Sequence, residues 1–259
     1  MPPSRPSHDV RFVLRQLVEK DFKVRYRNMS LGIFWSLLNP LIMMTVMSFV
    51  FTVIFPNPEK LYPLFIMAGL LPYNFFSQSW SAATSSIVSN STLVKKLSFP
   101  RELLPISVVL ASSVHFFIQL ALLMAAAVFF VGFSPLWALL PVIIVLHIIF
   151  TCGLALFFSA LDVYYRDTQY VVESTTMVLF WVVPIFYSFE EVSRRSALLA
   201  ELYSFNPLAA VIFLVRRVLI YQQNPGWVII AKLGLISIAV FAVGLWFFRR
   251  MEREFVDHL

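Results

Sequence analysis

The chain has little charge, little glycine and almost no cysteine. Charged residues make up 13% of its 259 positions and hydrophobic residues 59%, whereas a typical soluble domain has about 25% and about 45–50%. A chain with so few charges cannot cover its apolar residues with a hydrated surface, so its main solvent must be lipid. The single cysteine, Cys152, lies in an apolar run and excludes an intramolecular disulfide framework.

Motifs for covalent chemistry and nucleotide binding are also missing. The sequence has no phosphate-binding loop of the form GxxxxGKS or GxxxxGKT, no HExxH, no GxSxG and no metal-spaced Cys/His cluster. His115 and His147 lie within apolar segments, where an ionisable side chain is a functional candidate. A neutral ring donating one interhelical hydrogen bond is the simpler explanation for each. We therefore expect no enzyme activity, cofactor or metal site in this chain.

Six apolar segments are long enough to cross a bilayer, which takes about 20 residues. They are Leu31–Phe55, Tyr62–Val88, Leu103–Val131, Pro135–Leu161, Tyr170–Tyr187 and Trp227–Phe248. The second is the least apolar because its later half is rich in serine, and we expect this face to pack on other helices or to line a pore. The sequence predicts an all-α polytopic membrane protein, with six transmembrane helices over residues 31–248 and no second domain.

The distribution of lysine and arginine orients these segments. Of the 20 basic residues, 14 lie in the first thirty residues, in the loops after the second and fourth segments, or in the tail after Phe248. Because cytoplasmic loops carry this excess, we expect the N-terminal segment (residues 1–30) and the tail (residues 249–259) in the cytoplasm. The net charge of +6 then reflects membrane orientation and does not indicate nucleic-acid binding.

Apolar residues of the N-terminal segment follow a helical spacing, at Val10, Val13, Leu14, Leu17 and Val18. This pattern predicts an amphipathic helix on the inner leaflet, with its cations near anionic headgroups. A positively charged flank with no further role is the alternative. A cleavable signal peptide is excluded, because the apolar run that follows continues past twenty residues.

One long external segment is expected, at Ser188–Gly226. It alternates charged residues with apolar pieces, such as Leu208–Leu214, that are too short to span. We therefore expect external re-entrant helices before the last span, which dip into the outer leaflet or lie on it.

Two cytoplasmic loops carry clustered charges. Ser91–Pro105 contains two lysines and an arginine, and its first part is expected to form a short helix parallel to the membrane, which Pro100 ends. Leu161–Asp167 places Arg166 between Asp162 and Asp167, close enough to pair locally. Solvated charge that only sets the topology is the alternative for both loops.

Three motifs together resemble a known family. "RYRNMSLGIFWSLLNPL" (Arg25–Leu41), "LVKKLSFPRELLP" (Leu93–Pro105) and "VYYRD" (Val163–Asp167) are similar to the transmembrane subunits of ABC transporters that export polysaccharides. The resemblance covers nearly the whole chain, and it is closer to O-antigen and wall teichoic acid permeases than to capsule permeases.

This resemblance implies a transport subunit and no catalytic residues. Such permeases form homodimers and bind two copies of a separate ATPase subunit, which holds ATP and Mg. The implied substrate is a polysaccharide on undecaprenyl pyrophosphate, most closely O-antigen, moved across the bacterial inner membrane. Teichoic acid, capsule, another lipid or a drug is the alternative cargo.

The resemblance also implies roles for particular residues. Those expected to couple the permease to the ATPase are Leu93, Val94, Lys95, Lys96, Leu97, Phe99 and Arg101. The expected cytoplasmic interface residues are Asp162, Tyr165, Arg166 and Asp167. Candidate conduit aromatics, which could instead face lipid, are Phe34, Trp35, Phe180, Trp181 and Tyr187.

Four arginines are hypothetical ligands of the charged lipid headgroup, because guanidinium binds a pyrophosphate bidentately. They are Arg25 and Arg27 on the inner side and Arg216 and Arg217 on the outer side. For the first pair the alternative role is anchoring to the leaflet. For the second pair it is an external salt bridge with Glu190 or Glu191.

Overall fold

A computed structural model describes residues 10–26, 34–54, 61–97, 99–196, 201, 203 and 205–259. All regular elements in these ranges are helices. They are α1 (Val10–Tyr26), α2 (Phe34–Phe49), η1 (Val50–Ile54), α3 (Tyr62–Thr84), α4 (Ser86–Ser89), α5 (Ser91–Lys96), α6 (Leu103–Phe130), η2 (Pro135–Leu139), α7 (Leu140–Tyr164), α8 (Thr168–Val182), α9 (Phe189–Arg195), α11 (Pro207–Leu219), α12 (Trp227–Met251), η3 (Glu252–Glu254) and α13 (Phe255–His258).

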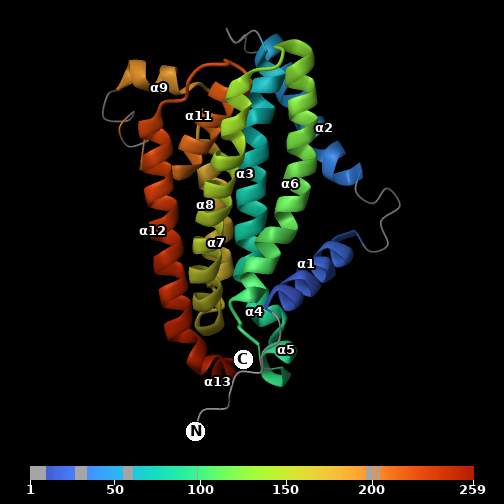
Figure 1. The fold of residues 1–259 in the computed structure, drawn as a ribbon, viewed down its shortest axis with the longest axis vertical. Coiled ribbons are helices and arrows are strands. Elements are labelled where there is room, and N and C mark those ends of the chain that lie inside the picture. The colour runs from blue at the N-terminus through green and yellow to red at the C-terminus, as the bar shows by residue number, and fades with distance from the viewer. Residues whose placement is uncertain are drawn as a thin grey trace.

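The long helices α3, α6, α7, α8 and α12 run side by side along the long axis (Figure 1). At one end, called the α5 end below, lie α4, α5 and α13. At the other, the α11 end, lie α9 and α11. Helix α1 slants away from the bundle beside the part of α6 nearest the α5 end.

Within the described ranges, three segments are long and apolar enough to cross a membrane: Leu103–Phe130, Pro135–Tyr164 and Trp227–Glu254. The other three expected spans are also helical, but α2 and α8 have only 16 and 15 residues. Helix α3 has 23 residues, and hydroxyl and amide side chains make its second half less apolar. The expectation of an all-helical membrane protein is confirmed.

The fifth apolar segment forms a shorter helix than expected. Helix α8 ends at Val182 rather than Tyr187, and Val183 is extended with ψ of 141°. The reason is Pro184, because the residue before a proline avoids the helical conformation. The amide of Val183 still donates to the carbonyl oxygen of Leu179, and the backbone from Pro184 to Tyr187 is not helical.

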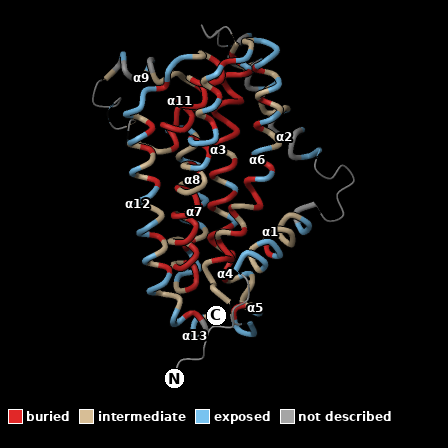
Figure 2. The backbone as a smooth tube through the Cα atoms, in the orientation of Figure 1, coloured by how far each residue is buried: buried red, intermediate tan, exposed pale blue. Residues whose placement is uncertain are grey.

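Buried residues form two clusters. The larger centres on α3, which is buried along most of its length (Figure 2). There His147 donates from Nε2 to the carbonyl oxygen of Pro72 at 3.1 Å, which confirms the interhelical bond expected for this histidine. The ring of His115 stacks on Phe22 of α1 at 5.3 Å.

The smaller cluster, the α5-end cluster, joins seven helices from along the whole described chain. Its buried members are Leu17, Ile87, Val94, Leu103, Leu104, Leu156, Ala160, Val163, Phe248 and Phe255. They come from α1, α4, α5, α6, α7, α12 and the terminal α13, so that the N-terminal helix, the short loop helices and the tail share one core.

Helices α7 and α12 touch through their backbones. A Cβ added to Gly153 would lie 2.6 Å from the backbone nitrogen of Phe241, and one added to Gly244 would overlap the carbonyl oxygen of Gly153. Glycine at both positions allows this approach, as in many pairs of membrane helices.

Candidate functional site

The α5 end gathers most of the residues expected to couple the chain to a partner. In α5, Val94 points into the α5-end cluster, whereas Lys95 and Lys96 are exposed and Leu97 is 57% exposed. Leu93 is half-buried, and Phe99 packs against the cluster. One face of this short helix is therefore anchored, and the other presents two cations and an apolar side chain.

The turn between α5 and α6 is tied to the end of α12. Arg101 donates from Nη1 to the carbonyl oxygen of Glu252 at 2.5 Å. The neighbouring Glu102 forms an ion pair with Arg249 at 3.4 Å. Arg101 therefore holds the α5–α6 turn against the end of α12, in addition to any contact that it makes with a partner protein.

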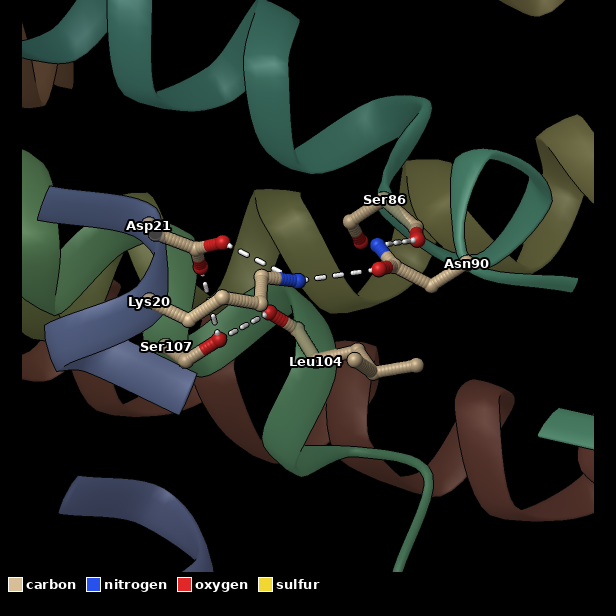
Figure 3. Close-up of polar contacts among 6 residues, drawn as sticks. All are labelled: Lys20, Asp21, Ser86, Asn90, Leu104 and Ser107. Atoms are coloured by element: carbon tan, nitrogen blue, oxygen red, sulfur yellow. Dashed lines mark hydrogen bonds and ion pairs between the residues drawn. The ribbon is translucent and has the colours of Figure 1, made fainter. Parts of the chain in front are cut away.

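A polar bridge joins α1 to the start of α5 (Figure 3). Lys20 donates from Nζ to Asn90 Oδ1 at 2.9 Å and lies 3.3 Å from the carboxylate of Asp21. The amide of Asn90 donates in turn to the carbonyl oxygen of Ser86 at 2.8 Å, at the start of α4. We call this contact the Lys20–Asn90 bridge.

The same site reaches α6 through Ser107. Its hydroxyl lies 3.2 Å from Asp21 Oδ2 and 2.8 Å from the carbonyl oxygen of Leu104, and both can accept its proton. Ser107 itself is buried. Helix α1 is therefore attached both to the α4–α5 segment and to α6, through residues some 70 to 90 positions away in the sequence.

The outward face of α1 is charged. Glu19 pairs with Arg15 at 3.0 Å and with Lys23 at 3.6 Å, and the hydrogen bond from Arg15 lowers the pKa of the Glu19 carboxyl. An open groove along this face is lined by Gln16, Glu19, Lys20, Lys23 and Val24.

Two of the headgroup candidates lie at the end of α1. The backbone of Arg25 belongs to its last turn. The side chain of Arg25 and all of Arg27 lie outside the described residues.

The turn from α7 to α8 also lies at this end. Asp162 is buried, with 3% exposure, whereas Tyr165 is 66% exposed and Arg166 and Asp167 are exposed as well. Three of the four expected interface residues are therefore accessible to a partner, and the fourth belongs to the interior.

At the α11 end, Arg216 is buried with 4% exposure. Its guanidinium donates to the carbonyl oxygens of Phe65, Pro184, Ile185 and Tyr187, at 3.1 Å, 2.6 Å, 2.5 Å and 3.2 Å. It also lies 3.4 Å from the centre of the Phe65 ring. Binding a lipid headgroup at Arg216 would require these bonds to break.

Arg217, the other outer candidate, has a different setting. It is half-buried, bonds Gln223 at 3.3 Å and lies 5.3 Å from the centre of the Phe213 ring. Its Nε is buried with no acceptor among the described residues.

The expected conduit aromatics fall into two groups. Phe180 and Trp181 pack together at 5.3 Å at the end of α8, and the hydroxyl of Tyr187 donates back to the carbonyl oxygen of Val182 at 2.5 Å. Phe34 and Trp35 are exposed in the first turn of α2.

A row of polar side chains lies on α3 and α8. The sequence analysis expected the polar half of α3 to pack on other helices or to line a pore, but it did not identify the α8 residues of this row. Gln169 of α8 donates to Ser81 of α3 and to Glu173, both at 2.9 Å. On α3, Asn74, Ser77, Gln78 and Ser81 share one face that is not buried. We call these six residues the α3–α8 polar strip. The sequence signal for the α8 part of this strip was the spacing of Gln169 and Glu173, two polar residues four positions apart in an apolar segment.

The chain is similar to known transport proteins over most of its length. The chain is 30% identical to the O-antigen export system permease protein RfbA of Klebsiella pneumoniae, over 94% of this chain and 93% of the relative. It is 28% identical to the protein of the same name from Myxococcus xanthus, over 98% of each chain. The polysialic acid transport protein KpsM of Escherichia coli is 23% identical, over 90% of this chain and 91% of the relative.

A family model described as ABC-2 type transporter matches residues 13–220, which include most of α1, the α4–α5 segment and α11. This match spans most of the sequence, and the chain therefore belongs to the ABC-2 type transporter family.

Proposed function

We propose that this chain is the permease subunit of an ATP-driven exporter that moves lipid-linked polysaccharide of the O-antigen class across the bacterial inner membrane. The observation that carries the proposal is the similarity to O-antigen export permeases over nearly the whole length of both chains. The lower identity to a polysialic acid transporter favours O-antigen over capsule as the cargo.

The proposed topology has six spans, formed by α2, α3, α6, η2–α7, α8 and α12. The exposed lysines of α5 and the arginines at the end of α12 support a cytoplasmic α5 end. Helix α1 then lies at the inner leaflet with its charged face toward the headgroups. Helices α9 and α11 form the external re-entrant part.

The proposed partner is a separate ATPase subunit, two copies of which bind a homodimer of this chain and hold ATP and Mg. The exposed Lys95, Lys96 and Leu97 of α5 form its docking surface, supported by the burial of the opposite face of α5. Closure of the ATPase moves α5, and the Lys20–Asn90 bridge passes this motion to α1. The charged lipid headgroup enters beside the end of α1, at Arg25 and Arg27.

The proposed conduit for the sugar chain follows the α3–α8 polar strip. Its hydroxyl, amide and carboxylate groups are unsuited to lipid and can exchange hydrogen bonds with sugar hydroxyls. The aromatic side chains at the end of α8 offer faces for sugar rings. Homodimer formation shields this strip from the bilayer.

The function is tested by complementation. In cells that lack the native gene but keep the partner ATPase and the glycan-synthesis enzymes, expression of this chain should restore the surface glycan and clear lipid-linked glycan from the inner face. If lipid-linked glycan stays inside although the chain and ATPase co-purify, the cargo is of another class. Rescue of strains defective in teichoic acid or capsule export, or of drug resistance, identifies that class.

The headgroup hypothesis has its own test in the same cells. Substitution of Arg25→Ala together with Arg27→Ala should reduce glycan export and substrate-stimulated ATP hydrolysis. Unchanged export at a normal protein level would restrict these arginines to anchoring the leaflet helix.

A further inference from the structure

The residues after α12 fold back into the protein. The chain passes from α12 through η3 into α13, where Phe255 is fully buried. Its ring meets Phe248 at 5.4 Å and 90°, and Tyr164 at 6.3 Å. His258 lies over Tyr164 at 4.4 Å. This tail had been expected only to carry positive charge.

Backbone carbonyls of the tail bind side chains of two other elements. Arg101, at the turn between α5 and α6, donates to the carbonyl oxygen of Glu252 at 2.5 Å. Tyr164, at the end of α7, donates its hydroxyl to the carbonyl oxygen of Met251 at 2.9 Å. The carbonyl of Met251 ends α12 and that of Glu252 lies in η3, where it also accepts the backbone amide of Phe255. The contacts therefore fix the direction in which the tail leaves α12.

The tail also shares its core with the docking helix. Phe255 belongs to the α5-end cluster together with Val94, the anchored residue of α5, and Leu17 of α1. Figure 1 shows α13 and the C-terminus at the same end of the bundle as α5. A displacement of α5 must therefore move the tail, or break its contacts with Arg101 and the cluster.

We propose that residues 252–259 are a positioning element that holds α5 and its turn in the docking orientation and links their motion to α7 and α12. This inference rests on the proposed function, in which α5 binds the ATPase. Phe255 acts through the α5-end cluster, which also contains Val94, and the carbonyl of Glu252 acts through Arg101. Neither touches the cargo. The tail is thus a second route for the motion of α5, beside the Lys20–Asn90 bridge to α1.

The test compares variants of the full chain in the purified complex with its ATPase. Phe255→Ala removes the aromatic side chain of the tail from the α5-end cluster, whereas Phe255→Leu keeps a large apolar side chain there. Tyr164→Phe removes only the hydroxyl group that donates to the carbonyl oxygen of Met251. Arg253→Ala, an exposed residue of the same tail, is the control. For each, three quantities are measured: complex yield, the change in ATP hydrolysis when permease joins ATPase, and glycan exported per ATP.

We expect Phe255→Ala to reduce glycan exported per ATP at least fivefold and to alter the hydrolysis response, with Phe255→Leu restoring most of both. Tyr164→Phe, which preserves packing, should reduce export per ATP about twofold with normal yield, and Arg253→Ala should match the unmodified chain.

Two outcomes overturn the inference. In one, Phe255→Ala and Tyr164→Phe lower only the yield, while export per ATP and the hydrolysis response stay unchanged. In the other, Phe255→Ala does not assemble and Tyr164→Phe behaves like the unmodified chain. If the unmodified complex exports no glycan, the proposed cargo fails, and the tail is then judged on the hydrolysis response alone.

Discussion

At the scale of single residues, Arg216 supplies hydrogen-bond donors to backbone carbonyl groups that follow the end of helix α8 and have no helical partners. Helix α8 stops before Pro184, and the non-helical segment that follows it is largely buried, where each unsatisfied backbone carbonyl is costly. The planar guanidinium supplies five donors in a fixed fork, and Arg216 uses them on carbonyls of the α8 end and of α3. One side chain thereby joins α3, α8 and α11.

We expect Arg216→Met to lower the melting temperature of the detergent-purified protein by roughly 5–10 °C, since it removes several charge-assisted hydrogen bonds worth about 1.5–3 kcal/mol each before relaxation. Arg216→Lys should recover only part of this loss, because one ammonium cannot reach the same set of carbonyls. Arg217→Met, with its single 3.3 Å hydrogen bond, should change the melting temperature by about 2 °C or less. Normal melting of Arg216→Met combined with lost export would instead favour the headgroup role.

At the scale of helices, the contact between α7 and α12 depends on two glycines. Gly244→Ala would place a methyl group against the carbonyl of Gly153. The methyl group is fixed directly on the α12 backbone and the carbonyl belongs to the α7 backbone, so neither can move without shifting a helix. Overpacking of this kind costs about 1–3 kcal/mol or more. We therefore expect a melting temperature lower by at least several degrees, measured by fluorescence-detected size exclusion after heating.

Gly234 of the same helix is the matched control for this substitution. A Cβ there would meet only the flexible end of Leu146 at 3.8 Å, an ordinary contact. Gly234→Ala should melt like the unmodified protein. Equal melting of the Gly234 and Gly244 variants would contradict the close crossing of α7 and α12.

The Lys20–Asn90 bridge makes a second prediction at this scale. Lys20→Met and Asn90→Ala should each weaken the link between α1 and α5, and the double variant should lose no more than the worse single one. The expected coupling energy is about 0.5–1.5 kcal/mol, seen as a roughly two- to tenfold fall in ATPase stimulation. Lys23→Met, which loses only an exposed pair with Glu19, is the control. Additive effects of the two substitutions would mean that the residues act separately.

At the scale of the whole molecule, the proposed topology is tested by cysteine labelling. Cys152 is buried, and Cys152→Ala provides a background without cysteine. In it, Phe133→Cys, at the exposed turn before η2, should react with an impermeant maleimide added to intact spheroplasts. Lys96→Cys in α5 should react only after the membrane is opened. If both cysteines are labelled from the same side of the membrane, the chain does not cross the membrane an odd number of times between α5 and this turn. The proposed topology would then be wrong.

The helical elements follow closely from local sequence signals. Apolar runs predicted every long helix, and prolines mark ends that the structure shows, such as Pro207 at the first turn of α11. Pro184 also explains why α8 ends early, a local signal that the predicted span ignored.

The contacts that build the candidate site do not follow from local signals. Lys20 and Asn90 are 70 positions apart, and Arg216 and Phe65 are 151 apart. No periodicity identifies such partners, because they depend on how the helices pack. The docking of Phe255 was missed for the same reason, since a phenylalanine in a short charged tail gives no sign of where it is buried.

The position of Phe255 in the chain also orders the events of biosynthesis. Every other buried member of the α5-end cluster lies before it in the sequence, so the ribosome makes it after all of them. Chains fold from the N-terminus as they are made, and α1, α5 and α12 must wait together with an open core until this residue emerges. A nascent chain stalled before Phe255 should therefore be unable to recruit its ATPase, which would make assembly of the transporter depend on translation through this residue.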